Sequence, residues 1–192
     1  MTNQKNKSKM QKNQEVIKEV ELPGGVTASL TNNSLSIKGP KGEVIRLLIH
    51  KNLSVSVGDK KILVKAASSK KEDKKSMGSL IAHIKNMVRG SQQAHVYILK
   101  VCSGHFPMNI SVGNNKFTVK NFLGEKVPRT LHLKPGADVK VEGDHVYVSS
   151  LSKELAGQTG ADIEQLTRRP GYDSRVFQDG IWMISKDGKE IK

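Results

Sequence analysis

The sequence predicts an α+β fold made of two tandem copies of a small, mainly antiparallel sheet covered by one helix. Three observations lead to this prediction. The chain matches itself at a shift of about 82 residues. Each copy alternates apolar and polar residues between short turns, and each copy carries one apolar stripe at helical spacing. Because strands outnumber helices and the turns are of hairpin length, we expect antiparallel pairing with one helix over each sheet.

The repeat consists of an ordered series of matches. An apolar alternation, an Asn-Asn pair and a Gly-Glu pair occur in the same order in both copies. In the first copy these residues are Ala28, Leu30, Asn32, Asn33, Leu35, Ile37, Gly42 and Glu43; in the second they are Ile110, Val112, Asn114, Asn115, Phe117, Val119, Gly124 and Glu125. The repeat predicts a first α+β repeat over 15–94 and a second over 95–185, with a C-terminal tail over 186–192. The segment 1–14 is rich in Lys, Asn and Gln and is expected to be a disordered basic tail.

The strands of each copy are expected on both sides of its turns. Asn32-Asn33 is typical of a tight hairpin, because Asn tolerates the positive φ that such turns need. The glycines of 39–42 break the chain before an apolar run over 44–49. Further strands are expected over 53–57, 62–64, 95–102, 139–141 and 146–148.

The two helices follow the last hairpin of each copy. Leu80, Ile81, Ile84 and Val88 form one stripe, which predicts a helix from about Lys75 to Arg89. The second helix is expected from about Lys153 to Arg169, where Pro170-Gly171 stops it.

The charge of the chain points to an anionic partner. Its 192 residues carry a formal net charge of +14, and the sequence pI is about 9.9. Nucleic acid is the leading candidate and an anionic membrane surface the second. No apolar run reaches the roughly 18 residues that a spanning helix needs, so we expect no membrane protein. The single cysteine, Cys102, excludes an internal disulfide and fits a reducing cytoplasm.

Two lysine-rich stretches are candidate RNA contacts. The N-terminal tail carries Lys5, Lys7, Lys9 and Lys12. A second stretch before the first helix contains Lys60, Lys61, Lys70, Lys71, Lys74 and Lys75. Contact with phosphates would release counterions and make the affinity fall steeply with salt. The alternative is a solubilising tail and a solvated loop.

A third basic segment follows the second helix. Arg168, Arg169 and Arg175 lie near Tyr172 in the sequence. Arginine forks suit phosphates and base edges, and an aromatic face can stack on an unpaired base. The alternative is that these arginines satisfy the carbonyls at the helix end. We expect Phe177 and Trp182 in the core.

Catalysis has little support in the sequence. Cys102 and His105 are spaced like a pair of metal ligands, but no second Cys/His pair follows. Gly39-Pro40-Lys41-Gly42 lacks the Gly-Lys-Ser/Thr ending of a phosphate-binding loop. The Gly-x-Ser-x-Gly pattern does not occur. We therefore expect no enzyme, no catalytic residue, no cofactor and no metal.

Four segments together resemble a known family. They are Lys38-Gly39-Pro40-Lys41-Gly42, His83-Ile84-Lys85-Asn86-Met87-Val88-Arg89-Gly90, His105-Phe106-Pro107 with Asn121-Phe122-Leu123-Gly124-Glu125, and Arg175-Val176-Phe177-Gln178-Asp179-Gly180-Ile181. In this order they resemble the universal large-subunit ribosomal protein six in its archaeal and eukaryotic form, over roughly residues 15 to 185. Trp182 stands where the family more often has Tyr or Phe, and the N-terminal tail has no matched counterpart.

The resemblance implies a structural ribosomal protein that acts in translation, in the cytoplasm, as part of a ribonucleoprotein. It implies binding to large-subunit ribosomal RNA near the sarcin-ricin loop and the base of the factor-binding stalk, beside neighbouring ribosomal proteins. It assigns most contacts to the second repeat. The residues matched to them are Arg168, Arg169, Tyr172, Arg175 and Gln178. The alternative is a free RNA-binding regulator or RNA chaperone that uses the same surface.

Overall fold

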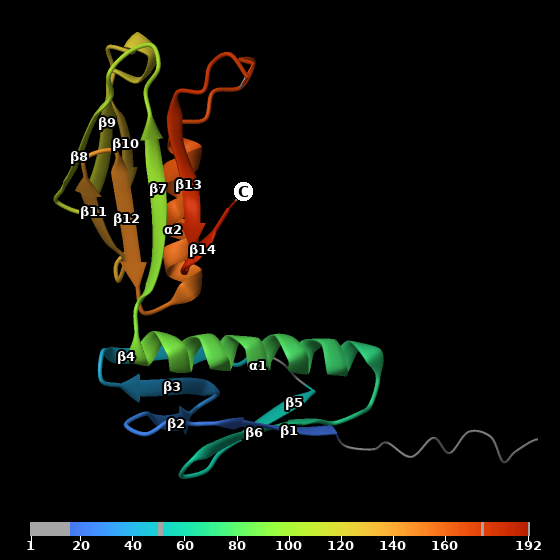
Figure 1. The fold of residues 1–192 in the computed structure, drawn as a ribbon. Coiled ribbons are helices and arrows are strands. Elements are labelled where there is room, and N and C mark those ends of the chain that lie inside the picture. The colour runs from blue at the N-terminus through green and yellow to red at the C-terminus, as the bar shows by residue number, and fades with distance from the viewer. Residues whose placement is uncertain (1–15, 50–51, 174, 192) are drawn as a thin grey trace, which may run out of the picture. The chain divides into compact units, whose positions relative to one another are not determined.

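A computed structural model describes residues 16–49, 52–173 and 175–191. The chain divides into two compact units, with the boundary between Ser91 and Gln92 (Figure 1). The basic tail predicted over 1–14 lies outside the described residues. Within them, no helix is long and apolar enough to cross a membrane.

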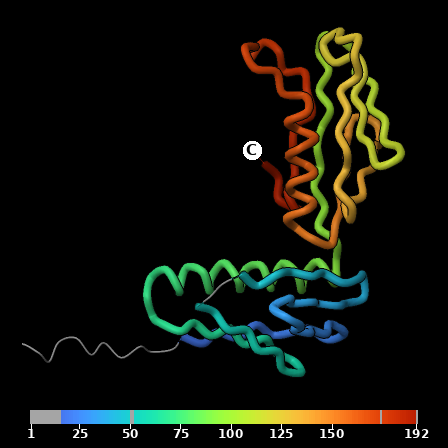
Figure 2. Tube along the Cα trace, turned by 180° about the vertical axis from the view of Figure 1, so that it is seen from behind, coloured from blue at the N-terminus to red at the C-terminus, as the bar shows by residue number. Residues whose placement is uncertain are grey.

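The first unit contains two three-stranded sheets and one helix. One sheet has the order β1-β6-β5 and the other β2-β3-β4, and all their pairings are antiparallel. Figures 1 and 2 show the helix α1 lying along the sheets. The elements are β1 (Val16–Glu21), β2 (Thr27–Thr31), β3 (Ser34–Gly39), β4 (Gly42–Leu47), β5 (Leu53–Val57), β6 (Lys61–Ala66) and α1 (Lys71–Gln92).

The second unit repeats this plan and extends it. One sheet has the order β10-β9-β8, and the other is five-stranded with the order β11-β12-β7-β13-β14. The helix α2 contacts β7, β12 and β13. The elements are β7 (His95–Cys102), β8 (Asn109–Gly113), β9 (Lys116–Lys120), the 3-10 turn η1 (Phe122–Gly124), β10 (Arg129–His132), β11 (Asp138–Glu142), β12 (His145–Ser150), α2 (Lys153–Leu166), β13 (Gly180–Lys186) and β14 (Lys189–Glu190).

The predicted fold class is therefore confirmed, with one addition. Each unit is α+β with antiparallel strands and one helix, and β7, β12 and β11 pair in the same order as β1, β6 and β5. In the first unit β1 is a sheet edge, whereas in the second β13 pairs along the free side of β7. The chain after α2 thus returns to the sheet, and the loop that brings it back has no equivalent in the first unit.

The hairpin turns form as their residues predict. Asn32 and Asn33 have φ of 46° and 63°, and Asn114 and Asn115 have 50° and 57°. Two successive positive φ values match the right-handed twist of the flanking strands, and Asn adopts them more readily than most residues.

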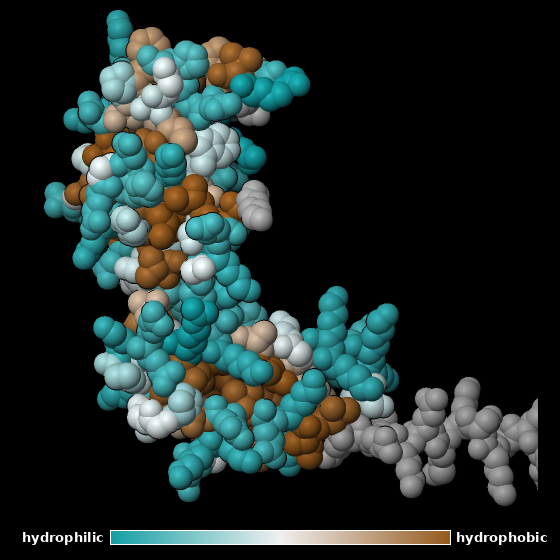
Figure 3. Space-filling model, viewed as in Figure 1, coloured by the Kyte–Doolittle hydropathy of each residue, from teal (hydrophilic) through white to brown (hydrophobic). Residues whose placement is uncertain are grey.

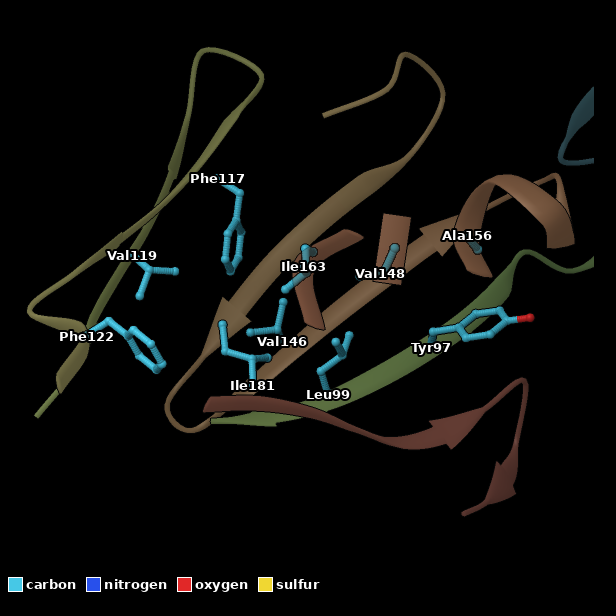
Figure 4. Close-up of a cluster of buried hydrophobic side chains, with 10 residues drawn as sticks. All are labelled: Tyr97, Leu99, Phe117, Val119, Phe122, Val146, Val148, Ala156, Ile163 and Ile181. Carbon is cyan, nitrogen blue, oxygen red and sulfur yellow. The ribbon is translucent and has the colours of Figure 1, made fainter. Parts of the chain in front are cut away.

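Both cores are mainly aliphatic. Leu35 and Ile37 of β3 are fully buried, as are Phe117 and Val119 at the repeat-related positions of β9. Figure 4 shows the core of the second unit, where Ile163 of α2 lies near Leu99, Val146 and Ile181 of the sheet. This core holds the start of β13, and with it one end of the preceding loop.

Hydrophilic side chains cover much of each unit outside these cores. On the face drawn in Figure 3, apolar residues reach the surface in patches between hydrophilic ones. This distribution is ordinary for a folded domain, whose surface always keeps some apolar area. Hydropathy therefore does not mark a binding surface, which has to be found from charge and geometry.

Three sequence predictions are wrong in detail. The helix α1 begins at Lys71 rather than Lys75, because its added first turn is charged and its buried member is Asp73, which gives no apolar signal. The helix α2 ends at Leu166, three residues before Arg169, so the arginines lie beyond it. Trp182 is not in the core: it points outward from β13 and is 36% exposed, and Phe177 is half-buried.

Candidate nucleic-acid interface

The basic segment after α2 forms a loop that returns to the sheet. We call residues 167–173 and 175–179 the C-terminal loop; it lies between α2 and β13, at the same end of the unit as η1 (Figure 1). Its two ends are tied together, because the Ile181 backbone N–H donates to the Thr167 hydroxyl at 2.9 Å. Thr167 is also buried, so the loop starts and finishes on the core.

A buried carboxylate fixes the far end of the loop. Asp179 accepts hydrogen bonds from the backbone N–H of Gly104 at 2.6 Å, from the backbone N–H of His105 at 3.0 Å and from the His105 Nδ1. Burial opposes its charge, but these hydrogen bonds outweigh burial and lower the pKa of Asp179 below its ordinary value. The His105 ring stacks on Phe177 with centroids 5.2 Å apart. Asp179 therefore joins the loop to the chain that follows β7.

An arginine clamp fixes the near end. Arg129 donates from Nε and Nη2 to the two carboxylate oxygens of Glu125 at 2.8 and 2.6 Å, and from Nη1 to the Leu166 carbonyl at 2.7 Å. Its guanidinium also lies 4.4 Å from the centre of the Phe122 ring. Hydrogen bonding by Arg129 lowers the pKa of Glu125 despite partial burial. Arg129 thus satisfies a carbonyl at the end of α2, a task that Arg168 and Arg169 do not have to perform.

Between these two anchors lies a cleft of about 640 Å³. Its walls come from the end of α2, η1, the C-terminal loop and β13. Two predicted contacts, Arg168 and Tyr172, are exposed on it, and Arg169 lies with its guanidinium 4.3 Å from the centre of the Tyr172 ring. The structure therefore brings three of the five predicted loop residues together around one cavity.

The other two predicted loop residues lie outside the cleft lining. Arg175 is bound to Asp173 through Nε and Nη2 at 3.1 and 3.0 Å, and its side chain is 88% exposed. This pair raises the pKa of Arg175 and lowers that of Asp173. Gln178 is exposed and donates to the Arg175 carbonyl at 3.4 Å. Both are accessible from solvent on the same loop.

The predicted lysines of the first unit form two separate groups. Lys60 and Lys61 lie where β6 begins, and Lys61 pairs with Glu19 at 2.9 Å. This hydrogen bond raises the pKa of Lys61. The other lysines lie beyond the opposite end of β6, at the start of α1; they are Lys70, Lys71, Lys74 and Lys75, and all are exposed. The length of β6 thus separates the two groups.

The residues that hold the site in place are not evident from the sequence. Sequence patterns assign no role to Arg129, Glu125 or Asp179, although Glu125 and Asp179 fall within the family-like segments. Arg129 and Glu125 lie four residues apart, but the bonds that tie them and Asp179 to the rest of the site run to Leu166, 37 residues from Arg129, and to Gly104, 75 residues from Asp179, so only the folded structure reveals them. Across the described part of the chain, no group of three or more His, Cys, Asp or Glu side chains could hold a metal ion.

A model of a known family matches both units. It is described as "Ribosomal protein L6" and matches residues 22–94 and 106–180, which is most of the chain in two segments.

The chain belongs to the ribosomal protein L6 family.

Curated relatives agree with this assignment. A "Large ribosomal subunit protein uL6" from Methanothrix thermoacetophila is 38% identical over 173 residues, covering 90% of this chain and 98% of the relative. Proteins of the same name from Methanobrevibacter smithii and Methanosarcina mazei are 39% and 37% identical, over 88% and 90% of this chain and 95% and 98% of theirs. The predicted resemblance is confirmed. As a member of the L6 family the chain is a structural ribosomal protein and not an enzyme.

Proposed function

We propose that this L6 family protein is a cytoplasmic structural constituent of the large ribosomal subunit and binds large-subunit ribosomal RNA chiefly through the second repeat, residues 95–185. The expected position, from the family resemblance, is near the sarcin-ricin loop and the base of the factor-binding stalk, beside other ribosomal proteins. The observation that carries the RNA role is the cleft flanked by Arg168, Arg169 and Tyr172.

The mechanism is electrostatic docking on a rigid scaffold. Arg168 is exposed and has no acidic partner among the ion pairs of the described residues. Arg169 lies 4.0 Å from Glu125, whose charge Arg129 already balances. Arginine forks pair well with phosphate oxygens, and backbone contacts of this kind position a protein on folded RNA. Because Arg129 and Asp179 hold the loop at both ends, little ordering entropy would be lost on binding.

The lysines at the start of α1 are proposed as a second, weaker RNA contact. Four cations at a helix N-terminus oppose the helix dipole, so helix stability does not account for them. Glu72 and Asp73 balance part of this charge, but Asp73 is buried and accepts hydrogen bonds from Ser68 and Asn52. The exposed surface of this turn is therefore mainly cationic, which suits phosphate contacts. The members are Lys70, Lys71, Lys74 and Lys75.

Co-sedimentation distinguishes this function from a free RNA-binding regulator or chaperone. Tagged protein expressed in cells should travel with the large subunit through a gradient at moderate salt, and should leave it only in high salt. A free regulator would stay at the top of the gradient or wash off at moderate salt. Protein that fails to enter assembled subunits, while still binding naked RNA, would contradict the structural role.

A further inference from the structure

The cleft of the second unit gathers aromatic side chains in a chain that has few of them. The sequence contains four Phe, three Tyr and one Trp. Within the described residues, four of these aromatic side chains line the cleft: Phe122, Tyr172, Phe177 and Trp182. They come from η1 and from the C-terminal loop with the start of β13, which lie about 50 residues apart in the sequence. Folding thus collects half of the aromatic residues at a cationic surface.

These rings are held in place without all being buried in the core. Trp182 is 36% exposed and its indole N–H donates to the Gln178 carbonyl at 3.0 Å. Tyr172 is 43% exposed and meets the edge of Phe177 at a centroid distance of 4.9 Å. Phe177 is stacked in turn on His105. Phe122 is buried in the core and the Arg169 guanidinium covers one face of Tyr172, so the accessible parts of Tyr172 and Trp182 form the stacking surface. Because these rings are already fixed, the surface needs little reorganisation to receive a flat ligand.

The charge of the cleft selects an anionic ligand. Arg168 and Arg169 line it, whereas its acidic member, Asp179, is engaged by His105 and Gly104. Gln165 is exposed on the same wall and offers an amide that can both donate and accept hydrogen bonds. A volume of about 640 Å³ lies in the range of sites for small organic ligands. A flat aromatic ring joined to an anion fits this combination better than an apolar side chain or a phosphate alone.

We propose that the cleft receives a single unpaired nucleotide of the RNA, with its base stacked on the aromatic faces and its phosphate beside Arg168 and Arg169. The inference rests on the proposed function and specifies it further: RNA would be recognised at an extruded or bulged base and not through its backbone alone. Base stacking on aromatic side chains is tolerant of base identity, so the site would select an unpaired base more than a particular sequence.

The chain carries its own reporter for this proposal, because Trp182 is its single tryptophan. The full-length protein is titrated with two short RNA hairpins. One has a single bulged adenosine. In the other an added uridine pairs with that adenosine and the loop is one nucleotide shorter, so that both hairpins have the same length and charge. We expect the bulged hairpin to bind about tenfold more tightly, in keeping with one stacked base. It should quench Trp182 emission, and the paired hairpin should leave that emission nearly unchanged.

Substitutions in the cleft distinguish the contribution of base stacking to RNA binding from that of charge. Tyr172→Leu should abolish the preference for the bulged hairpin, so that this variant binds the two hairpins with similar affinity. Tyr147→Leu, which changes a tyrosine of β12 outside the cleft, should keep the preference. Circular dichroism of each variant checks that it folds. Quenching of Trp182 is measured on the unmodified protein, so this test does not depend on the folding of a variant.

The outcomes distinguish this inference from the function on which it rests. Equal binding of both hairpins without quenching, together with weaker binding by Arg168→Ala/Arg169→Ala, would overturn the base site and leave RNA docking through the loop intact. If that double substitution alters binding to neither hairpin, the proposed function of the loop fails as well.

Discussion

The guanidinium of Arg129 donates to both carboxylate oxygens of Glu125, through Nε at 2.8 Å and Nη2 at 2.6 Å. Its remaining nitrogen, Nη1, donates to the Leu166 carbonyl at the end of α2 at 2.7 Å. One side chain at the start of β10 therefore connects the turn after β9 to the helix end. Nη1 also donates to the Arg168 carbonyl at 3.4 Å, so the clamp contacts the start of the C-terminal loop.

The first prediction is that Arg129→Ala destabilises the protein by about 2 kcal/mol, because it removes charge-assisted hydrogen bonds in a mostly shielded place and leaves the Leu166 carbonyl without this donor. Arg129→Lys should recover only part of the loss, since an ammonium cannot reproduce the planar fork. Urea denaturation of each variant measures the free energy of unfolding.

The matched control is Arg175→Ala. Arg175 also makes two hydrogen bonds to one carboxylate, that of Asp173, but its side chain is 88% exposed. Exposed pairs contribute little, so this substitution should cost less than about 0.5 kcal/mol. Equal destabilisation by Arg129→Ala and Arg175→Ala would mean that the clamp stabilises the fold no more than an exposed ion pair does.

A second prediction concerns pH and Asp179. Its pKa is lowered in the folded protein, so its stabilising contribution is fully present above the ordinary carboxyl pKa and is lost as the pH falls through the lowered value. Asp179→Asn should therefore cost about 1–3 kcal/mol at neutral pH. The difference from the unmodified protein should shrink below about pH 4. Denaturant titrations at several pH values test this, and a difference that grows on acidification would contradict it.

A third prediction compares two glycines of the first unit. A Cβ on Gly39 would lie 2.7 Å from the Ser91 carbonyl oxygen, a backbone atom that cannot turn away. The Lys41 N–H donates to the same carbonyl at 3.0 Å. Gly39→Ala should cost about 1–3 kcal/mol through this overlap. Gly78→Ala lies in α1 with open space around it and should stabilise by about 1 kcal/mol. Thermal unfolding of both variants should show shifts of opposite sign.

Local patterns in the sequence predict much of the fold. The Asn-Asn hairpins, the β5–β6 and β11–β12 hairpins and the start of α2 all depend on residues close together in the chain. Ser152 illustrates this: its hydroxyl accepts from the Leu155 N–H at 3.4 Å and caps α2 where the predicted helix begins. Such interactions are encoded within a few residues, so periodicity and turn chemistry reveal them.

Elements that depend on distant partners are not predicted. Strand β1 has only two partly or fully buried residues, Val16 and Val20, because it is a sheet edge. Strand β13 exists because β7 offers it a free side, which its own sequence does not indicate. The apolar character of Trp182 favours a place in the core, but the register of β13 buries Ile181 and turns Trp182 outward.

The candidate site also has residues that can be predicted from the sequence and others that cannot. Arg168, Arg169 and Tyr172 can be predicted because charge and aromatic character are visible in the sequence. The cleft beside them cannot, since its walls come from two separate stretches of the chain, at 122–123 and from Gln165 to Trp182. Asp179 gives no sign of its role as an anchor because its partners, Gly104 and His105, lie about 75 residues earlier.

The salt dependence of binding to a large-subunit RNA fragment tests RNA docking through the C-terminal loop most directly. The variant Arg168→Ala/Arg169→Ala/Arg175→Ala is compared with Lys116→Ala/Lys140→Ala/Lys189→Ala, which removes the same charge from exposed positions of the second unit outside the cleft lining. We expect the arginine variant to bind more weakly, with a salt slope that falls by about one for each phosphate it no longer neutralises. The lysine variant should stay close to the unmodified protein. Equal weakening in both variants, or unchanged binding by the arginine variant, would contradict RNA docking through the C-terminal loop.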